Sequence, residues 1–312
     1  MLALLEVKNL VKKFGTFSAV NNISFSVKQG EIVGLLGANG AGKTTTIQML
    51  LTAITPTSGS INYFGLELAT HRSEILQQVA FASTYVKMPG NITVYNNLDI
   101  YGRLYGLSGK QRKQVIEKYL YTFGMWHMRD SPVALLSAGQ TTRAMLAKAF
   151  LANPRIILLD EPTASLDLDV ALEVRAFILE QRRKNDCTVL ITSHNMDEVA
   201  AVCDRVLVMQ HGALIANDTP ARLAATLNQA RIELVIEHNQ EAACTYARKH
   251  ALEYRLKANT FVVRIDEYKI AAFLKHFAAA DIEYSSITID KPSLEDYFLH
   301  MTHNQKKNIT LL

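Results

Sequence analysis

Residues 31–54 read EIVGLLGANGAGKTTTIQMLLTAI, which is an apolar strand, a glycine-rich loop and a helix in immediate succession. The loop from Gly37 to Thr44 fits the pattern G-x-x-x-x-G-K-S/T. Glycines suit such a loop because backbone N–H groups must turn inward and approach an anion closely, which Cβ atoms would obstruct. The start of the helix adds a dipole that favours negative charge. This order therefore predicts a phosphate-binding loop.

The loop also supplies a charge and a metal ligand. Lys43 is expected to neutralise the β- and γ-phosphates of a nucleoside triphosphate, and the Thr44 hydroxyl to bind Mg²⁺. A glycine-rich turn without a ligand is the alternative, but the strand before the loop and the helix after it favour a nucleotide. Contacts to the nucleotide are expected from Gly37, Ala38, Asn39, Gly40, Ala41, Gly42, Lys43, Thr44 and Thr45.

Two adjacent carboxylates follow the apolar run Ile156–Leu159. Asp160 and Glu161 would stand where a buried strand emerges, and α/β sheets bind their ligands at the carboxyl ends of strands. Successive strand residues point to opposite sides, so the two acids divide the work. We expect Asp160 to hold Mg²⁺ through water and Glu161 to act as the general base toward the attacking water. Lys43, Asp160 and Glu161 together predict turnover rather than binding alone.

Composition narrows the class of protein. The formal net charge of +4 over 312 residues is too small to predict nucleic-acid binding. No apolar run approaches the roughly 20 residues of a membrane helix, and Glu6 and Lys8 come too early for a secretion signal. The chain is therefore expected to be soluble, with any membrane role supplied by a partner. Cys187, Cys203 and Cys244 lack metal-site spacing and are expected to be reduced core residues.

The periodicity predicts an α/β fold with several parts. Ile23, Phe25 and Val27 alternate with polar residues, which predicts antiparallel strands within residues 1–30. Short apolar runs at 31–36, 156–159 and 188–192, with a charged helix at 168–184, predict a doubly wound core with parallel strands. Residues 73–135 are predicted to be mostly helical. Their aromatic residues suit either a core or a docking groove for a partner's helix; these are Tyr85, Tyr95, Tyr101, Tyr105 and Trp126.

The pattern changes beyond residue 225. Strands are predicted at 231–237, 254–258, 260–265 and 284–289, and helices at 241–251 and 267–280. The resulting order, β-α-β-β-α-β, is the ferredoxin-like arrangement. We therefore predict a nucleotide-binding domain at 1–225, a small α+β accessory or regulatory domain at 226–303 and a flexible tail at 304–312.

A third motif carries a resemblance to a known family. The sequence Leu136-Ser137-Ala138-Gly139-Gln140 resembles the LSGGQ signature of ATP-binding-cassette (ABC) ATPases. The match continues through Arg143, the run from Asp160 to Thr163, the run from Ser165 to Asp167 and the run from Thr192 to His194, and it covers roughly residues 4–222. This resemblance implies a P-loop NTPase with a RecA-like parallel-sheet core, an antiparallel β subdomain and a helical subdomain at about 85–150.

The same resemblance assigns roles across two copies. It implies that Phe14 stacks on adenine and that His194 contacts the γ-phosphate as a switch. The signature loop would meet the γ-phosphate held by the opposite subunit, and Asp167 would link the two sites. The loop consists of Ser137, Ala138, Gly139 and Gln140. A predicted helix from Thr141 to Leu151 supports this role, because its free N-terminus suits an anion that its own loop does not hold. ATP and Mg²⁺ are therefore the predicted cofactors.

Two positions depart from the family pattern. Aligning the run from Asn91 to Val94 with the usual NLTV places Thr84 where the family has a glutamine that touches Mg²⁺ and the attacking water. Threonine is shorter, so a water would bridge its hydroxyl to the metal, and slower hydrolysis is expected. Ala138 replaces one signature glycine, which is a smaller change because Ser137 and Gly139 are present.

Residues 292–299, PSLEDYFL, resemble the PSLEDVFL segment that ends many drug- and lipid-exporter ATPases. This implies an ATP-hydrolysing exporter subunit on the cytoplasmic face of the inner membrane. Its partners would be a separate membrane-spanning subunit and a second copy or a paralogous ATPase. The alternative is an ABC-type ATPase that acts on ribosomes or nucleic acid. The single cassette and the lack of sustained heptads between the phosphate loop and the signature favour the transporter.

Overall fold

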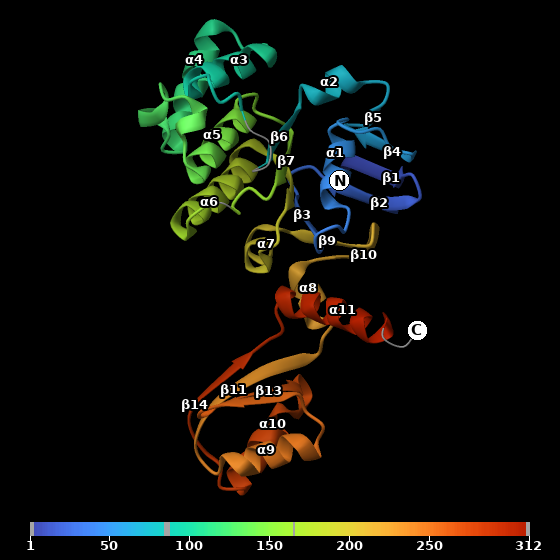
Figure 1. Ribbon diagram of the computed structural model, residues 1–312, viewed down its shortest axis with the longest axis vertical. Coiled ribbons are helices and arrows are strands. Elements are labelled where there is room, and N and C mark those ends of the chain that lie inside the picture. Colours follow the sequence, from blue (N-terminus) through green and yellow to red (C-terminus); the bar gives the residue numbers. More distant parts are fainter. Residues whose placement is uncertain (1–2, 84–87, 165, 310–312) are drawn as a thin grey trace. The chain divides into compact units, whose positions relative to one another are not determined.

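The structure is a computed structural model that describes residues 3–83, 88–164 and 166–309, with side chains as far as Met301. The chain divides into two compact units, Met1–Thr219 and Pro220–Leu312, and most of their helices and strands are labelled in Figure 1. The sequence placed the boundary six residues later, after residue 225. It lies earlier because the helix that starts at Pro220 packs within the second unit.

One sheet of the first unit is antiparallel. It has the order β2-β1-β4-β5, and its strands are β1 (Ala3–Phe14), β2 (Phe17–Lys28), β4 (Ser58–Tyr63) and β5 (Leu66–Glu67). Ile23, Phe25 and Val27 on β2 are buried, which confirms the predicted alternation of buried and exposed residues. The turn between β1 and β2 contains Gly15 at φ 60°, a conformation that glycine adopts without strain.

The second sheet of this unit is the parallel core. Its order is β10-β9-β3-β8-β7-β6, with every neighbouring pair parallel except β10 and β9. The strands are β3 (Ile32–Leu36), β6 (Val79–Ser83), β7 (Ile156–Asp160), β8 (Thr188–Thr192), β9 (Arg205–Gln210) and β10 (Ala213–Asp218). Every residue of β3, β7 and β8 is buried, as expected for strands covered on both faces.

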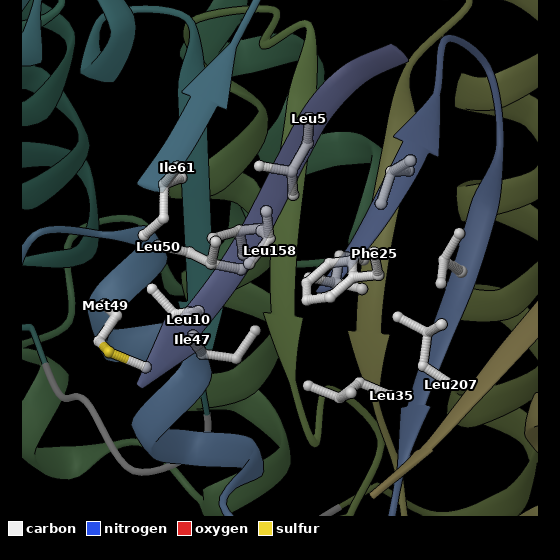
Figure 2. Close-up of a cluster of buried hydrophobic side chains, with 14 of the residues drawn as sticks. Leu5, Leu10, Phe25, Leu35, Ile47, Met49, Leu50, Ile61, Leu158 and Leu207 are labelled. Carbon is white, nitrogen blue, oxygen red and sulfur yellow. The ribbon is translucent and has the colours of Figure 1, made fainter. Parts of the chain in front are cut away.

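The main core of the first unit joins both sheets to the helix that follows the phosphate loop. Figure 2 shows Ile47, Met49 and Leu50 of α1 (Lys43–Leu50) among side chains from β1, β2, β3, β4, β7 and β9. These three side chains are at most 1% exposed. Packing therefore holds α1, and with it the phosphate loop, against both sheets. The first unit also has three helices outside the helical region among its described residues, α2 (Arg72–Leu76), α6 (Leu168–Asn185) and α7 (Met196–Val202).

A helical region lies between β6 and β7 in the chain. It contains α3 (Val94–Leu104), α4 (Gly109–Thr122), η1 (Trp126–Met128), η2 (Val133–Leu135) and α5 (Ala138–Phe150). The prediction that 73–135 is mostly helical missed β6, a five-residue strand. Its sequence, VAFAS, is too short to show a period, and only its pairing with β7 makes it a strand.

The aromatic core of the helical region differs from the predicted set. Tyr119, Phe123, Phe150 and Phe177 contact one another with ring centroids 4.7 to 6.3 Å apart. The predicted residues Tyr95, Tyr101, Tyr105 and Trp126 are half-buried instead, and Tyr85 lies outside the described residues. The sequence could not separate the two sets, because the aromatic contacts join α4, α5 and α6, which are far apart in the chain.

The second unit contains a four-stranded antiparallel sheet of order β12-β13-β11-β14. Its elements follow in the order α8 (Pro220–Ala225), β11 (Gln229–His238), α9 (Gln240–Lys249), β12 (Tyr254–Lys257), β13 (Thr260–Asp266), η3 (Glu267–Lys269), α10 (Ile270–Ala279), β14 (Glu283–Asp290) and α11 (Leu294–Ile309). The stretch from β11 to β14 has the β-α-β-β-α-β order. Its core contains Ile232, Leu234, Phe261, Phe273 and Phe277, each fully buried.

The last helix belongs to this second unit. Ser293 starts α11, because Asp296 N–H donates to Ser293 Oγ (3.1 Å) and Ser293 N–H donates to Asp296 Oδ2 (2.9 Å). Asp296 also pairs with Arg264 of β13 at 3.0 Å, and α11 packs against α8. Helix α11 runs to Ile309 and so includes residues 304–309, which the sequence had assigned to a tail.

Composition also led to predictions about membrane-spanning helices and about the three cysteines. Within residues 3–83, 88–164 and 166–309, no helix is both long and apolar enough to span a bilayer. The three cysteines are buried and free, as predicted. Burial raises the pKa of the Cys187 thiol to about 12, which keeps it protonated and unreactive at neutral pH.

Thr52, just after α1, is strained in the native backbone. Its φ is 59°, a left-handed conformation that is an outlier for a β-branched residue. Its Oγ1 is buried without a hydrogen-bond partner among the described residues. Both features cost free energy, because a Cβ in this conformation crowds the backbone and an unpaired buried hydroxyl has lost its water.

Replacing Thr52 with glycine should therefore stabilise the protein. We expect Thr52→Gly to raise the free energy of unfolding by about 1 kcal/mol, after allowing for the greater freedom of glycine in the unfolded chain. Urea unfolding followed by circular dichroism measures this change. Thr52→Ala is the matched control, since it removes the hydroxyl but keeps a Cβ. Equal stability of the two variants would show that the backbone is not strained at this position.

Candidate functional site

The glycine-rich loop lies between β3 and α1, in close contact with two other strands. A Cβ added to Gly42, whose φ is 105°, would lie 2.5 Å from the carbonyl oxygen of Ala19 on β2. A Cβ on Gly37 would lie 2.5 Å from the carbonyl oxygen of Met209 on β9. Neither backbone oxygen can move without disturbing its strand. Glycine is therefore required at both positions by the packing as well as by phosphate approach.

Lys43 is the first residue of α1 and folds back over its own loop. Its Nζ donates hydrogen bonds to the carbonyl oxygens of Gly37 (2.7 Å) and Ala38 (3.2 Å). Burial lowers the pKa of Lys43, and the negative charges of Glu161 and Asp160 partly offset this effect. The lysine therefore lies near enough to both carboxylates to interact with their charges.

A cavity of about 220 Å³ opens beside the loop. Its lining is Phe17, Ala19, Asn39, Gly40, Ala41, Gly42, Lys43, Thr44 and Thr45. The aromatic residue in this lining is Phe17, whereas the predicted adenine contact was Phe14. The two pair directly across the turn between β1 and β2, and they are 62% and 51% exposed respectively. The sequence analysis did not consider Phe17, because the family pattern points to one aromatic position; the aromatic residue on the other side of the Gly15-Thr16 turn was the available signal.

Asp160 is held at the end of β7 by the neighbouring strand. The Thr192 hydroxyl, at the end of β8, donates to Asp160 Oδ1 (2.6 Å) and accepts from the Glu161 N–H (3.1 Å). Asp160 is 4% exposed and Thr192 is fully buried. Ser83, at the end of β6, lies with its Oγ 3.5 Å from Asp160 Oδ2. Thr192 therefore fixes the Asp160 carboxylate and the backbone of Glu161, and the sequence analysis treated it only as part of a motif.

Glu161 and His194 are in direct contact. Glu161 Oε2 lies 2.7 Å from His194 Nδ1 and accepts a longer hydrogen bond from the His194 N–H (3.3 Å). Glu161 is 9% exposed and has φ 54°, an uncommon conformation for a residue other than glycine, while the His194 side chain is 70% exposed. The predicted base and the predicted switch thus form one pair, with the imidazole toward solvent.

The signature loop begins α5. Ser137 Oγ accepts from the Gln140 N–H (3.2 Å), and Gln140 Oε1 accepts from the Ser137 N–H (2.9 Å). This capping box starts the helix at Ala138, three residues before the predicted start at Thr141, because the capping side chains lie inside the motif itself. In the described part of the chain, no hydrogen bond joins residues 137–140 to the phosphate loop.

The chemistry of the predicted magnesium ligands suits the ion. Thr44 is exposed at the start of α1, and Asp160 supplies carboxylate oxygens near Lys43. Mg²⁺ prefers one or two such oxygen ligands and completes its shell with phosphate and water. No group of three or more His, Cys, Asp or Glu suited to a resident metal occurs among the residues described here. Thr84, the third predicted ligand, lies outside the described residues.

Comparisons with known proteins point in one direction. The family model described as "ABC transporter" matches residues 20–164. The chain is 30% identical to the bacitracin transport ATP-binding protein BcrA of Bacillus licheniformis, over 96% of this chain and 98% of that protein. A solved structure of cbiO1 from Clostridium perfringens, described as part of the ABC transporter complex cbiONQ, superposes with a TM-score of 0.63 at 26% identity. That superposition covers 72% of this chain and 91% of cbiO1.

One relative is considerably longer. The probable multidrug ABC transporter ATP-binding protein YbhF of Escherichia coli is 36% identical over 76% of this chain, but that alignment covers only 42% of YbhF. The chain therefore spans less than half the length of this relative, whereas it spans nearly all of BcrA.

Thr192→Val should destabilise the site measurably. Valine keeps the shape but removes the donor to buried Asp160, so we expect the free energy of unfolding to fall by about 2 kcal/mol. Thr188→Val is the matched control on the same strand, since Thr188 is equally buried but only accepts from the Gly30 N–H (3.0 Å). We expect it to cost about 1 kcal/mol in the same urea titration. Equal losses of stability in the two variants would mean that the hydrogen bond to Asp160 contributes no more than the one to the Gly30 N–H.

Proposed function

This chain belongs to the ATP-binding proteins of the ABC transporter family, and from that membership we propose that it binds and hydrolyses ATP with Mg²⁺ between two copies. The observation that carries the proposal is the meeting of Lys43, Asp160 and the Glu161–His194 pair beside one phosphate loop. These groups come from α1, β7 and the end of β8. Their meeting is what hydrolysis of a phosphoanhydride requires.

Each side chain has a defined task. Lys43 exchanges its two carbonyl acceptors for phosphate oxygens when nucleotide enters the loop. Glu161 accepts the proton of the attacking water, and His194 orients Glu161 and contacts the γ-phosphate. Thr44 and Asp160 would hold Mg²⁺, which when bound would supply positive charge to offset the charge on the phosphates. A water bridge from Thr84 would complete this set and would make hydrolysis slow.

The second copy supplies the other half of the site. The N-terminus of α5, with Ser137 and Gly139, would receive the γ-phosphate held by the partner's loop. Asp167 begins α6 and is exposed, as a residue that reaches across an interface must be. Leu135 and Leu168, next to these two segments, are 75% and 71% exposed. Exposed leucines beside both segments support a surface that is covered in the dimer.

The adenine ring would lie at the turn between β1 and β2. Phe14 and Phe17 are both exposed there, and Phe17 lines the cavity beside the phosphate loop. An aromatic face at this position suits stacking on a base. We propose that Phe17 contributes to adenine binding together with the predicted Phe14.

The transport role requires a membrane-spanning partner. Relatives of this chain include proteins named for bacitracin transport and for multidrug transport, and the segment 292–299 resembles that of exporter ATPases. We therefore propose export through a separate membrane subunit, with this chain on its cytoplasmic face. The alternative of an ATPase that acts on ribosomes or nucleic acid has no support in these relatives.

A trapped dimer tests the composite site. Glu161→Gln should bind ATP without hydrolysing it and elute as a dimer in size-exclusion chromatography. Adding Ser137→Arg should restore the monomer, because arginine would occupy the partner's phosphate position. The double variant should still bind a fluorescent ATP analogue, with its affinity changed by less than about threefold, since its own loop is intact.

Ser108→Arg in the Glu161→Gln background is the matched control for this dimer test. Ser108 starts α4, and its N–H donates to Gln111 Oε1 (3.3 Å), in the same local geometry that Ser137 has at α5. This variant should remain dimeric in ATP. A Glu161→Gln/Ser137→Arg protein that also remains dimeric would refute a site shared between copies.

Phe17→Ala tests the adenine contact. Loss of one stacking face should weaken binding of the ATP analogue about tenfold, in line with 1–3 kcal/mol per stacked base. Tyr121→Ala is the control, because Tyr121 is 58% exposed on α4, in the helical region. Binding by Phe17→Ala that matches Tyr121→Ala would leave the stacking role to Phe14 alone.

A further inference from the structure

A second glutamate lies behind the Glu161–His194 pair, on α7. Glu198 is 1% exposed, although it carries a carboxylate. The Thr163 hydroxyl lies 2.7 Å from each of its two oxygens, and the Ser193 hydroxyl donates to Oε2 (2.8 Å). Thr163 is two residues beyond Glu161, and Ser193 directly precedes His194. One buried carboxylate thus joins the segment that carries the base to the segment that carries the switch.

Glu198 also takes part in a ring of hydrogen bonds within the turn that contains His194. The Glu198 N–H donates to Asn195 Oδ1 (3.0 Å), and the Asn195 N–H donates to Ser193 Oγ (3.1 Å). Ser193 in turn donates to the Glu198 carboxylate. This ring of hydrogen bonds fixes the backbone on both sides of His194, and therefore the direction from which its N–H and Nδ1 approach Glu161.

A third element reaches the carboxylate. Arg175 lies two turns into α6, and its Nε is 3.5 Å from Glu198 Oε1, with a side chain only 16% exposed. The pair lacks hydrogen-bond geometry, and Arg175 Nε has no hydrogen-bond partner in the described part of the chain. Because α6 begins at Asp167, Glu198 is also connected to the helix whose start would face the second copy.

Stability alone is a weak reason for a charge at this position. Burial of a carboxylate costs several kcal/mol, and apolar packing often replaces a buried ion pair without loss. What a carboxylate does provide here is several acceptor sites for donors from three segments at once. The Glu198 carboxylate therefore serves to position these segments.

We propose that Glu198 is a positioning residue, which holds Glu161 and His194 in one catalytic geometry by fixing Thr163 and Ser193 and by pairing with Arg175. The proposal rests on the proposed ATPase function for its kinetic consequence. Its structural content, the joint fixing of residues 161–163 and 193–194, is independent of that function.

Steady-state kinetics of the full chain test the kinetic consequence. Glu198→Gln keeps the volume but loses the charge, so we expect kcat for ATP hydrolysis to fall at least about tenfold while KM changes less than about twofold. Thr163→Val should lower kcat in the same way, because it removes one donor to Glu198. Thr163→Ser, which keeps the hydroxyl, should retain activity close to that of the native protein.

Glu31→Gln is the matched control. Glu31 is also a largely buried glutamate paired with an arginine, Arg205, at 2.7 Å, but it lies at the start of β3, at the opposite end of that strand from the phosphate loop. The loss of this pair should lower the melting temperature and leave kcat unchanged. A Glu198→Gln protein that loses only stability, as Glu31→Gln does, would overturn the positioning role.

Amide hydrogen exchange gives a readout that does not depend on hydrolysis. Peptides that cover 159–164 and 190–197 should exchange faster in Glu198→Gln and Thr163→Val than in the native protein, and Glu31→Gln should leave both unchanged. Unchanged exchange in both peptides with unchanged kcat would refute the proposal. If the native chain hydrolysed no ATP while exchange rose as expected, the proposed ATPase function would fail and the positioning role would stand.

Discussion

The register in which β7 pairs with β8 is the constraint on which the site depends. Asp160 stands opposite Thr192, so both strands end at the same level and their following residues enter the same space. In this register the Thr192 hydroxyl donates to the Asp160 carboxylate and accepts from the Glu161 backbone N–H. A slip of one residue would turn Asp160 to the other face of the sheet and separate Glu161 from His194. Full burial of both strands makes such a slip expensive.

The glycines of the phosphate loop fix its position relative to the two sheets. Gly37 and Gly42 touch backbone oxygens of β9 and β2, so the loop is clamped between the two sheets. The helix that follows is anchored by Ile47, Met49 and Leu50 in the main core (Figure 2). Lys43 therefore starts from a fixed position, and only its side chain needs to move when phosphate replaces the loop carbonyls. A site arranged in this way loses little entropy when it binds its ligand.

Charged side chains connect separate segments at this site. Lys43 interacts with the charges of Asp160 and Glu161. Glu198 accepts hydrogen bonds from the segments that follow β7 and β8. Arg175 adds α6 to the same group. The three segments carry the proposed base, the proposed switch and the start of α6. In the proposed function, removal of the γ-phosphate would act on all three segments and, through α6, on the contact between two copies.

The motifs of residues 37–44, 136–140 and 156–161 were readable from the chain because each is a local pattern whose neighbours set its conformation. They were sufficient to predict the α/β fold and the family, and the site residues they name remain predictions. Other features depended on residues far apart in sequence. Strand β6 exists because β7 pairs with it, and α8 joins the second unit because α11 packs on it. Phe17 of β2 lines the same cavity as the phosphate loop, and Thr192 and Glu198 bond partners 30 or more residues away. Such contacts follow from the packing of whole elements, and no short stretch of sequence encodes them.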